Sequence, residues 1–163
     1  MRTQTMRTAA LAVVAMIAAG GSAPAQSSGQ AAAGPDRARL VGAWHMVSME
    51  EQAPDGTLTH RDDRDAMLVY TADGHVSVQV MYPASDISST TNSPYSKDGY
   101  EASFGSYDVD EQAHTVTHHV RGSLVRTLIG RDLPRVMQFS TDGHLTLRSA
   151  RPEEKWSVTW EHD

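Results

Sequence analysis

The fold class is decided by residues 37–50, which read Arg-Ala-Arg-Leu-Val-Gly-Ala-Trp-His-Met-Val-Ser-Met-Glu. A Gly-x-Trp motif ending at Trp44 opens a stretch that alternates in the manner of a β-strand. Because neighbouring side chains of a strand point to opposite faces, we expect Trp44, Met46 and Ser48 to share one face, with Met49 on the other. The stretch therefore predicts the first strand of a sheet, with Trp44 closing one end of the structure.

Only strands and hairpin turns are predicted after this stretch. Two hairpins are clear, because alternating apolar residues flank the turn signals Thr71-Ala72-Asp73-Gly74 and Thr141-Asp142-Gly143. Short strands continue at this spacing to the end of the chain, and no long helix interrupts them. The pattern predicts an all-β fold, an antiparallel up-and-down β-barrel of about eight to nine strands. The interior of an eight-stranded barrel holds either its own side chains or one small ligand.

The first 35 residues have a different composition from the rest. Residues 1–25 resemble a secretory signal peptide, with a basic start, an apolar core and the small-residue cleavage pattern Ala-Pro-Ala. The apolar core, residues 9–19, is shorter than the ~20 residues that a membrane span needs. Residues 26–35 are small and polar and predict a flexible linker, and 36–163 suit one barrel domain. We therefore expect a periplasmic or secreted protein with no stable membrane span after cleavage.

Composition excludes several classes of function. The chain has no cysteine, so disulfides, cysteine nucleophiles and cysteine metal sites are excluded. The net charge of −6 argues against nucleic acid as a partner, because phosphate binding requires a basic patch. The eight histidines are scattered, with no His-x-x-x-His or Glu-x-x-His spacing. The sequence therefore predicts no metal site and no cofactor.

Several motifs occur in an order that is more specific than any one of them. They are Gly42-x-Trp44, Leu68-x-Tyr70-x-x-Asp73-Gly74, Phe104-Gly105-x-Tyr107-x-Val109-Asp110 and Thr115-Val116-Thr117-His118-His119-Val120-x-Gly122-Ser123-Leu124. Together they resemble the bacterial and fungal lipocalin-like domain family, across essentially Leu40 to Glu161. The resemblance implies a calycin-type antiparallel barrel. It implies little about activity, because such a fold hosts many roles.

The pair His118-His119 is the most suggestive polar feature of the predicted strands. Adjacent residues face opposite ways, and Val116 and Val120 are expected to face the core, so we expect His118 inside and His119 outside. Two interpretations remain open. An internal His118 contacts a ligand or acts as a general acid or base, or it is a buried histidine paired with a neighbouring strand.

The residues that we predict to contact a ligand are Trp44, Gln79, Phe104, Tyr107, His118 and Arg135. Trp44 is either a ligand contact at the closed end or a core residue, since aromatic side chains dominate core burial. A buried Arg135 must be paired, so it is either a structural clamp, stacked over Trp44 or paired with a carboxylate, or a ligand anchor. Phe104 and Tyr107 differ in parity, and both face inward only if Gly105 forms a bulge.

The segment Pro83–Asp98 lacks periodicity and is long for a loop in a compact domain. It is either a lid over the open end of the barrel or a disordered insertion.

These features predict an exported lipocalin-like protein that binds a small hydrophobic or amphipathic molecule in the barrel. We expect an apolar pocket with a few polar groups, among them His118, Gln79 and Arg135. One alternative is a barrel enzyme, of the cyclase, isomerase or hydratase type, with His118 as acid or base. Another is a structural envelope protein whose barrel is filled by its own side chains. The sequence leaves the ligand and the oligomeric state open.

Overall fold

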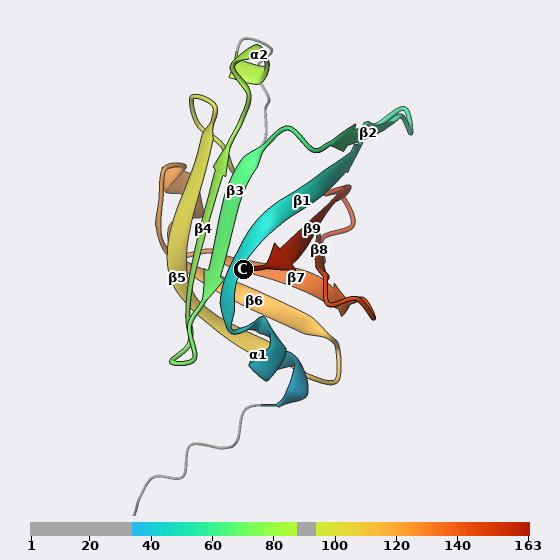
Figure 1. The fold of residues 1–163 in the computed structure, drawn as a ribbon. Helices are drawn as coiled ribbons and strands as arrows, with labels where there is room; N and C mark the ends of the chain where they lie inside the picture. The colour runs from blue at the N-terminus through green and yellow to red at the C-terminus, as the bar shows by residue number, and fades with distance from the viewer. Residues whose placement is uncertain (1–33, 88–93) are drawn as a thin grey trace, which may run out of the picture. The chain divides into compact units, whose positions relative to one another are not determined.

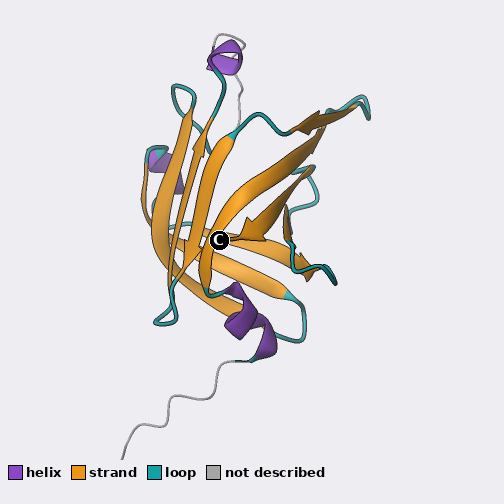
Figure 2. Cartoon of the chain, viewed as in Figure 1, coloured by secondary structure: helices purple, strands orange, loops and turns teal. Residues whose placement is uncertain are grey.

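A computed structural model describes residues 34–87 and 94–163 (Figure 1). The expected signal peptide, and the expected linker up to residue 33, lie outside the described residues. Short helices occur at three places, α1 (Pro35–Leu40), α2 (Ala84–Ile87) and the 3-10 turn η1 (Arg126–Leu128). Most of the rest is strand (Figure 2). The strands are β1 (Gly42–Gln52), β2 (Leu58–Arg61), β3 (Asp65–Tyr70), β4 (His75–Met81), β5 (Tyr100–Asp110), β6 (Thr115–Ser123), β7 (Asp132–Phe139), β8 (Leu145–Ser149) and β9 (Trp156–His162).

The strands form one antiparallel sheet that closes on itself. Its order is β2-β1-β3-β4-β5-β6-β7-β8-β9, and β1 also pairs with β9. Eight strands make the closed barrel, and β2 is an additional strand that pairs with the last residues of β1, Met49 to Gln52. On the same edge, β3 pairs with the first residues of β1, Gly42 to His45. The predicted all-β, up-and-down barrel is thus confirmed.

One end of the barrel is closed by α1 and a packed core. Figure 1 shows α1 across the lower end of the barrel. The indole Nε1 of Trp44 donates a hydrogen bond to the carbonyl oxygen of Leu40 at 2.8 Å, which ties β1 to α1. Backbone N–H groups of Asp36 and Arg37 donate to the Glu111 carboxylate at 2.9 and 3.0 Å. Those two N–H groups have no partner within the helix, so Glu111, from the β5–β6 turn, caps α1.

A β-bulge in β1 changes which side chains face inward. The pairing with β9 shifts between Met46 and Ser48, so Val47 is the extra residue on β1. Ser48 now pairs with Thr159, whereas Met49 pairs with the buried Val158. The prediction that Ser48 shares the face of Trp44 is therefore wrong. A bulge inserts one residue and resets the alternation beyond it, which places Met49 inside the barrel.

A second bulge lies between β5 and β6. Phe104 pairs with Gly122, but the next residue, Gly105, pairs with Val120. The extra residue is Arg121, on β6, and not on β5. The alternation of β5 therefore continues through Gly105, so that Phe104 faces solvent and Tyr107 faces the interior.

Among the described residues, none forms a helix of the length and apolar character that a bilayer crossing requires.

Candidate functional site

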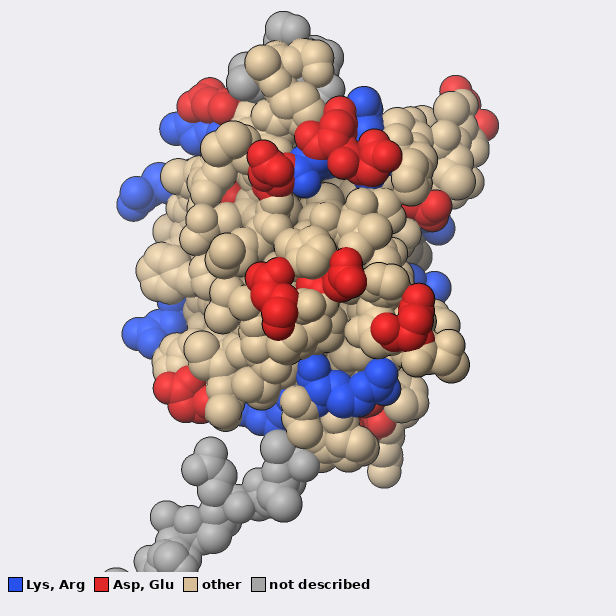
Figure 3. Space-filling model, viewed as in Figure 1, with Lys and Arg blue, Asp and Glu red and all other residues tan. Residues whose placement is uncertain are grey.

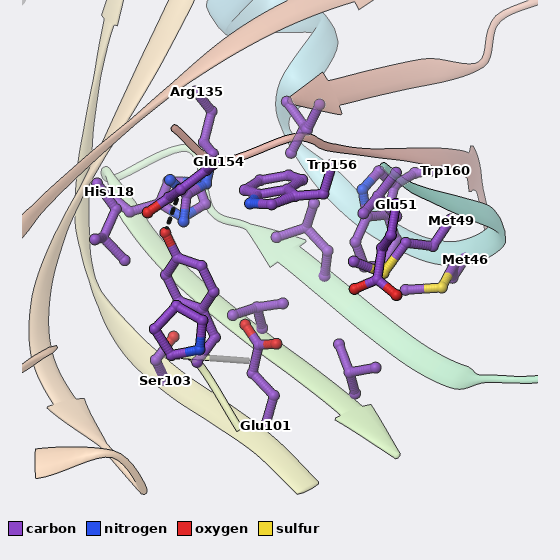
Figure 4. A pocket seen from close by; sticks show the side chains of 18 of the residues that line it. Met46, Met49, Glu51, Glu101, Ser103, His118, Arg135, Glu154, Trp156 and Trp160 are labelled. Carbon is purple, nitrogen blue, oxygen red and sulfur yellow. Dashed lines mark hydrogen bonds between the residues drawn. The ribbon is translucent and has the colours of Figure 1, made fainter. Parts of the chain in front are cut away.

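Away from α1, the barrel encloses a cavity of about 510 Å³ (Figure 4). This volume is in the range of small-molecule sites. The apolar part of its wall comes from β1, β3, β4, β7, β8 and β9: Met46, Met49, Leu68, Val78, Val80, Leu133, Leu147, Trp156, Val158 and Trp160. The polar part includes Glu101, Ser103, His118, Arg135 and Glu154. Exposed lining residues, Gln52, Pro94, Glu153 and Lys155, mark the mouth.

Arg135, on β7, is a buried cation in the wall of this cavity, with 6% of its surface exposed. Its guanidinium carbon lies 4.8 Å from the ring centre of Trp156 and 5.2 Å from that of Tyr95. Its Nη1 donates to the carbonyl of Pro134 at 3.3 Å, and the Tyr95 hydroxyl is close enough to accept from it. No carboxylate among the described residues lies within ion-pairing distance of it. A guanidinium has five N–H donors, so these two acceptors do not satisfy all of them within the described residues.

His118, on β6, is a buried and neutral histidine in the same wall. Its Nε2 lies 2.6 Å from the hydroxyl oxygen of Tyr70. Burial, then the positive charge of Arg135, lower the pKa of His118 to about 3. The ring is therefore uncharged at neutral pH. The predicted orientation is confirmed, since His119 lies outside, where its two ring nitrogens contact Asp132 at 2.7 Å and Asp108 at 3.0 Å.

Two carboxylates of the wall have different environments. Burial raises the pKa of Glu101 to about 7, although the positive charge of Arg135 and the Tyr82 hydroxyl, 3.5 Å away, act against this. Glu154 is well paired: it accepts from the Tyr95 hydroxyl at 2.6 Å and from Arg151 at 3.1 Å. These contacts and that of Ser149 outweigh its desolvation and lower its pKa. Glu101 is therefore the titratable carboxylate of the cavity near neutral pH.

The match to known families agrees with this architecture. The model of the lipocalin-like domain family matches residues 41–162, which is more than half of the chain. The chain belongs to the lipocalin-like domain family. The resemblance seen in the sequence motifs is thereby confirmed. A search of curated proteins finds no match to the chain, so the lipocalin-like barrel has to be interpreted from its own geometry.

Two of the six predicted ligand contacts, His118 and Arg135, line the cavity of this lipocalin-like barrel, and the other four do not. Trp44 is 2% exposed and packs in the core beside α1, where its ring centre lies 4.7 Å from that of His162 in a T-shaped arrangement. Of the alternatives left open for Arg135, stacking over Trp44 is wrong, because its guanidinium stacks on Trp156.

The remaining three lie below or outside the cavity. Gln79 is exposed on the outer surface, where its Oε1 accepts from the Tyr100 hydroxyl at 3.0 Å. Phe104 is 60% exposed and its ring covers Gly122. Tyr107 is buried, but its ring packs against Tyr70 in the core. The condition set for Phe104 and Tyr107 is not met, because the bulge falls on β6. We do not include these residues in the site.

Three further site residues were not predicted: Tyr95, Glu101 and Trp156. Glu101 has the parity of Tyr107 on β5, and Trp156 has that of Trp160 on β9. Their inward orientation was therefore readable from the alternation. Tyr95 lies in the segment Pro83–Asp98, which has no period. The end of that segment reaches the mouth of the cavity, whereas residues 88–93 lie outside the described part.

The histidines do not converge. Within residues 34–87 and 94–163, no three side chains of His, Asp or Glu are placed to hold one metal ion.

Proposed function

We propose that this lipocalin-like protein binds a small amphipathic molecule in its barrel. The observation that carries the proposal is the buried guanidinium of Arg135 on the wall of an otherwise mainly apolar cavity of about 510 Å³. The apolar body of the ligand would lie against side chains such as Leu68, Val78 and Leu147. Its polar end would lie beside Arg135 and His118.

The charge of Arg135 supports this assignment. A buried cation is costly unless it is paired and hydrogen-bonded. The aromatic faces of Tyr95 and Trp156 compensate part of this cost, each by about 1–2 kcal/mol at a desolvated site. The ring faces accept no conventional hydrogen bond, however, so the N–H donors of Arg135 that have no acceptor among the described residues still need one. A polar group of a ligand would provide them.

The alternatives draw less support from the same residues. A histidine with a pKa of about 3 is a weak base at neutral pH, and efficient general bases titrate near the working pH. This argues against His118 as an acid–base catalyst. A barrel filled throughout by its own side chains also fits less well, because a cavity of about 510 Å³ remains beyond the side chains that pack around Trp44 and Tyr107.

The test is native mass spectrometry of the protein purified gently from its own host. We expect a bound small molecule, or saturable quenching of tryptophan fluorescence when an apolar carboxylic acid is added, because Trp156 and Trp160 line the cavity. Leu147→Trp should narrow the cavity and weaken binding. Gln79→Ala, on the outer surface, should leave binding unchanged. A folded protein that binds neither a co-purifying molecule nor any apolar probe would contradict the proposal.

We also propose that the protein is exported and acts in the periplasm or outside the cell. The support is the pattern of residues 1–25 in the sequence. Intact-mass analysis of the purified protein tests it, with a chain that begins at Gln26 as the expected product. A protein that keeps residues 1–25 and remains in the cytoplasmic fraction would contradict export.

A further inference from the structure

His118 and Arg135 are neighbours on the inner surface of the barrel. β6 and β7 pair so that Val116 is opposite Arg135 and His118 is opposite Leu133. His118 and Arg135 are thus diagonal neighbours on adjacent strands, a relation in which long side chains reach one another. Both line the cavity, and Figure 4 shows them on the same side of it. Their polar groups therefore face one region of the cavity.

The contact between Tyr70 and His118 determines which nitrogen of the ring carries the proton. Tyr70 is 1% exposed, and its hydroxyl lies 2.6 Å from Nε2 of His118. Burial raises the pKa of Tyr70, so the hydroxyl keeps its proton. A buried O–H without an acceptor is costlier than an acceptor without a donor, so we assign the hydroxyl as donor to Nε2. A neutral imidazole carries one proton, which must then be on Nδ1.

This assignment gives the cavity a second donor. Nδ1 of His118 has no hydrogen-bond partner among the described residues, whose one hydrogen bond to this ring is made at Nε2. The cavity thus presents a charged donor, Arg135, beside a neutral donor, the Nδ1–H of His118. Tyr70 does not line the cavity, and it acts on a ligand only through His118.

We propose that the polar end of the ligand is a single carboxylate, held between the guanidinium of Arg135 and the Nδ1–H of His118, with Tyr70 as the residue that sets the tautomer of His118. The proposal rests on the binding function proposed above and specifies its ligand class, an amphipathic monocarboxylic acid.

The charges around the cavity favour one negative charge and no more. Arg135 supplies one buried positive charge, and a carboxylate would neutralise it with charge-assisted hydrogen bonds. A doubly charged group, such as a phosphate monoester, would bring an unpaired negative charge near Glu101 and Glu154, which also line the cavity. A neutral end, such as an ester or alcohol, would bring no charge to pair with Arg135, which interacts with Glu101 and Glu154 only from beyond ion-pairing distance.

The experiment compares two probes that differ only at the polar end, dodecanoic acid and methyl dodecanoate. Binding of each is measured by quenching of tryptophan fluorescence. We expect the wild-type protein to bind the acid at least roughly tenfold more tightly than the ester, the size of one hydrogen-bonded charge. Arg135→Met should abolish this preference. Tyr70→Phe should reduce it several-fold with little change in ester binding.

Tyr107→Phe is the matched control. It also removes a buried hydroxyl from the same core cluster, but that hydroxyl donates to the backbone oxygen of Thr71 and does not contact His118. It should keep the preference for the acid, while Tyr70→Phe should not. If both variants lower acid and ester binding equally, Tyr70 is merely structural and its role as positioning residue is overturned.

Nitrogen NMR of the histidine rings provides a readout independent of affinity. We expect His118 of the free wild-type protein to be the Nδ1–H tautomer, and Tyr70→Phe to shift the ring toward Nε2–H. An Nε2–H tautomer in the wild-type protein would overturn the inference. Equal binding of acid and ester would overturn it too, but would leave the proposed function intact. Binding of neither probe to the folded protein would count against both.

Discussion

At the scale of a single residue, the buried carboxylate of Glu101 in the cavity wall lowers the stability of the folded protein. A carboxylate in a mainly apolar wall is desolvated, and its pKa of about 7 follows from that burial. An apolar residue at this position on β5 would avoid the cost. The inward-facing charge is thus a feature that folding alone does not require.

Replacing Glu101 by Gln should therefore change stability in a pH-dependent way. Between the ordinary pKa of 4.5 and the folded-state pKa of about 7, the unfolded chain releases its proton before the folded protein does. The wild-type free energy of unfolding thus falls over this window and stays low above it. The full shift corresponds to ~3 kcal/mol. Because the side chain partly reaches the open cavity, we expect Glu101→Gln to stabilise the protein by roughly 1–2 kcal/mol at about pH 8.

Urea unfolding of both proteins at about pH 8 and about pH 4 measures this effect, which should vanish at the lower pH because both states are then protonated. Glu153→Gln, at the exposed mouth, is the control and should have little effect at either pH. An equal gain from Glu101→Gln at both pH values would show that amide packing, and not charge, is responsible.

The site residues show which properties of a single residue can be predicted from the sequence. The orientation of His118 and His119 was predicted correctly, because it depends only on the period-two alternation of a strand. Trp44 and Trp156 also both face inward, but one lies in the core and the other in the cavity wall. Their difference is depth along the barrel axis. Depth depends on strand register and tilt, which no local pattern encodes.

At the scale of the elements, two glycines in the β5–β6 pair, Gly105 and Gly122, have different structural roles. A Cβ at Gly105 would be far inside van der Waals contact with the carbonyl oxygen of His119 on β6. A Cβ at Gly122 would meet only the ring of Phe104, which is 60% exposed and can rotate away. Gly105 therefore permits two backbones to approach at the bulge, whereas Gly122 only makes room for a surface ring.

Gly105→Ala should destabilise the protein by about 3 kcal/mol or more, because the clash involves backbone atoms that cannot move without breaking strand pairing. Gly122→Ala should cost less than about 1 kcal/mol, since a flexible side chain absorbs the change. Denaturant unfolding of the two variants checks the contrast. Similar losses for both would mean that β6 relaxes freely at the bulge.

The same elements mark the limit of prediction from sequence. The two hairpins were predicted because turn residues and alternation are local signals. The bulges at Val47 and Arg121 were not, because neither residue carries a backbone signature, and the extra residue becomes visible only against the partner strand. The misplacement of Ser48 and the unmet condition of a bulge at Gly105 have this one cause. An alternation pattern predicts a face only up to the next bulge.

For the whole molecule, the charge around the cavity governs how a ligand would enter it. The net charge is −6, and on the face in Figure 3 acidic and basic groups are intermixed without an extended basic area. Near the mouth, Glu51 is paired with Arg64 and Glu154 with Arg151, whereas the exposed Glu153 has no ion-pair partner among the described residues. A carboxylate ligand would approach a protein of net negative charge, pass Glu153, and become paired with Arg135 only once inside. The rate of entry would therefore depend on salt more strongly than the buried contact with Arg135 does.

We expect the association rate of dodecanoate to rise several-fold as ionic strength increases from ~0.01 M to ~0.15 M, because the Debye length falls from ~30 Å to ~8 Å and screens the repulsion at the mouth. The dissociation rate should change less, since the contact with Arg135 is buried and poorly screened. Stopped-flow tryptophan fluorescence measures both rates. Methyl dodecanoate, which is neutral, should show no salt dependence, and Glu153→Gln should weaken that of the acid. An association rate that falls with salt would show that the field of Arg135 extends beyond the mouth and outweighs the acidic rim.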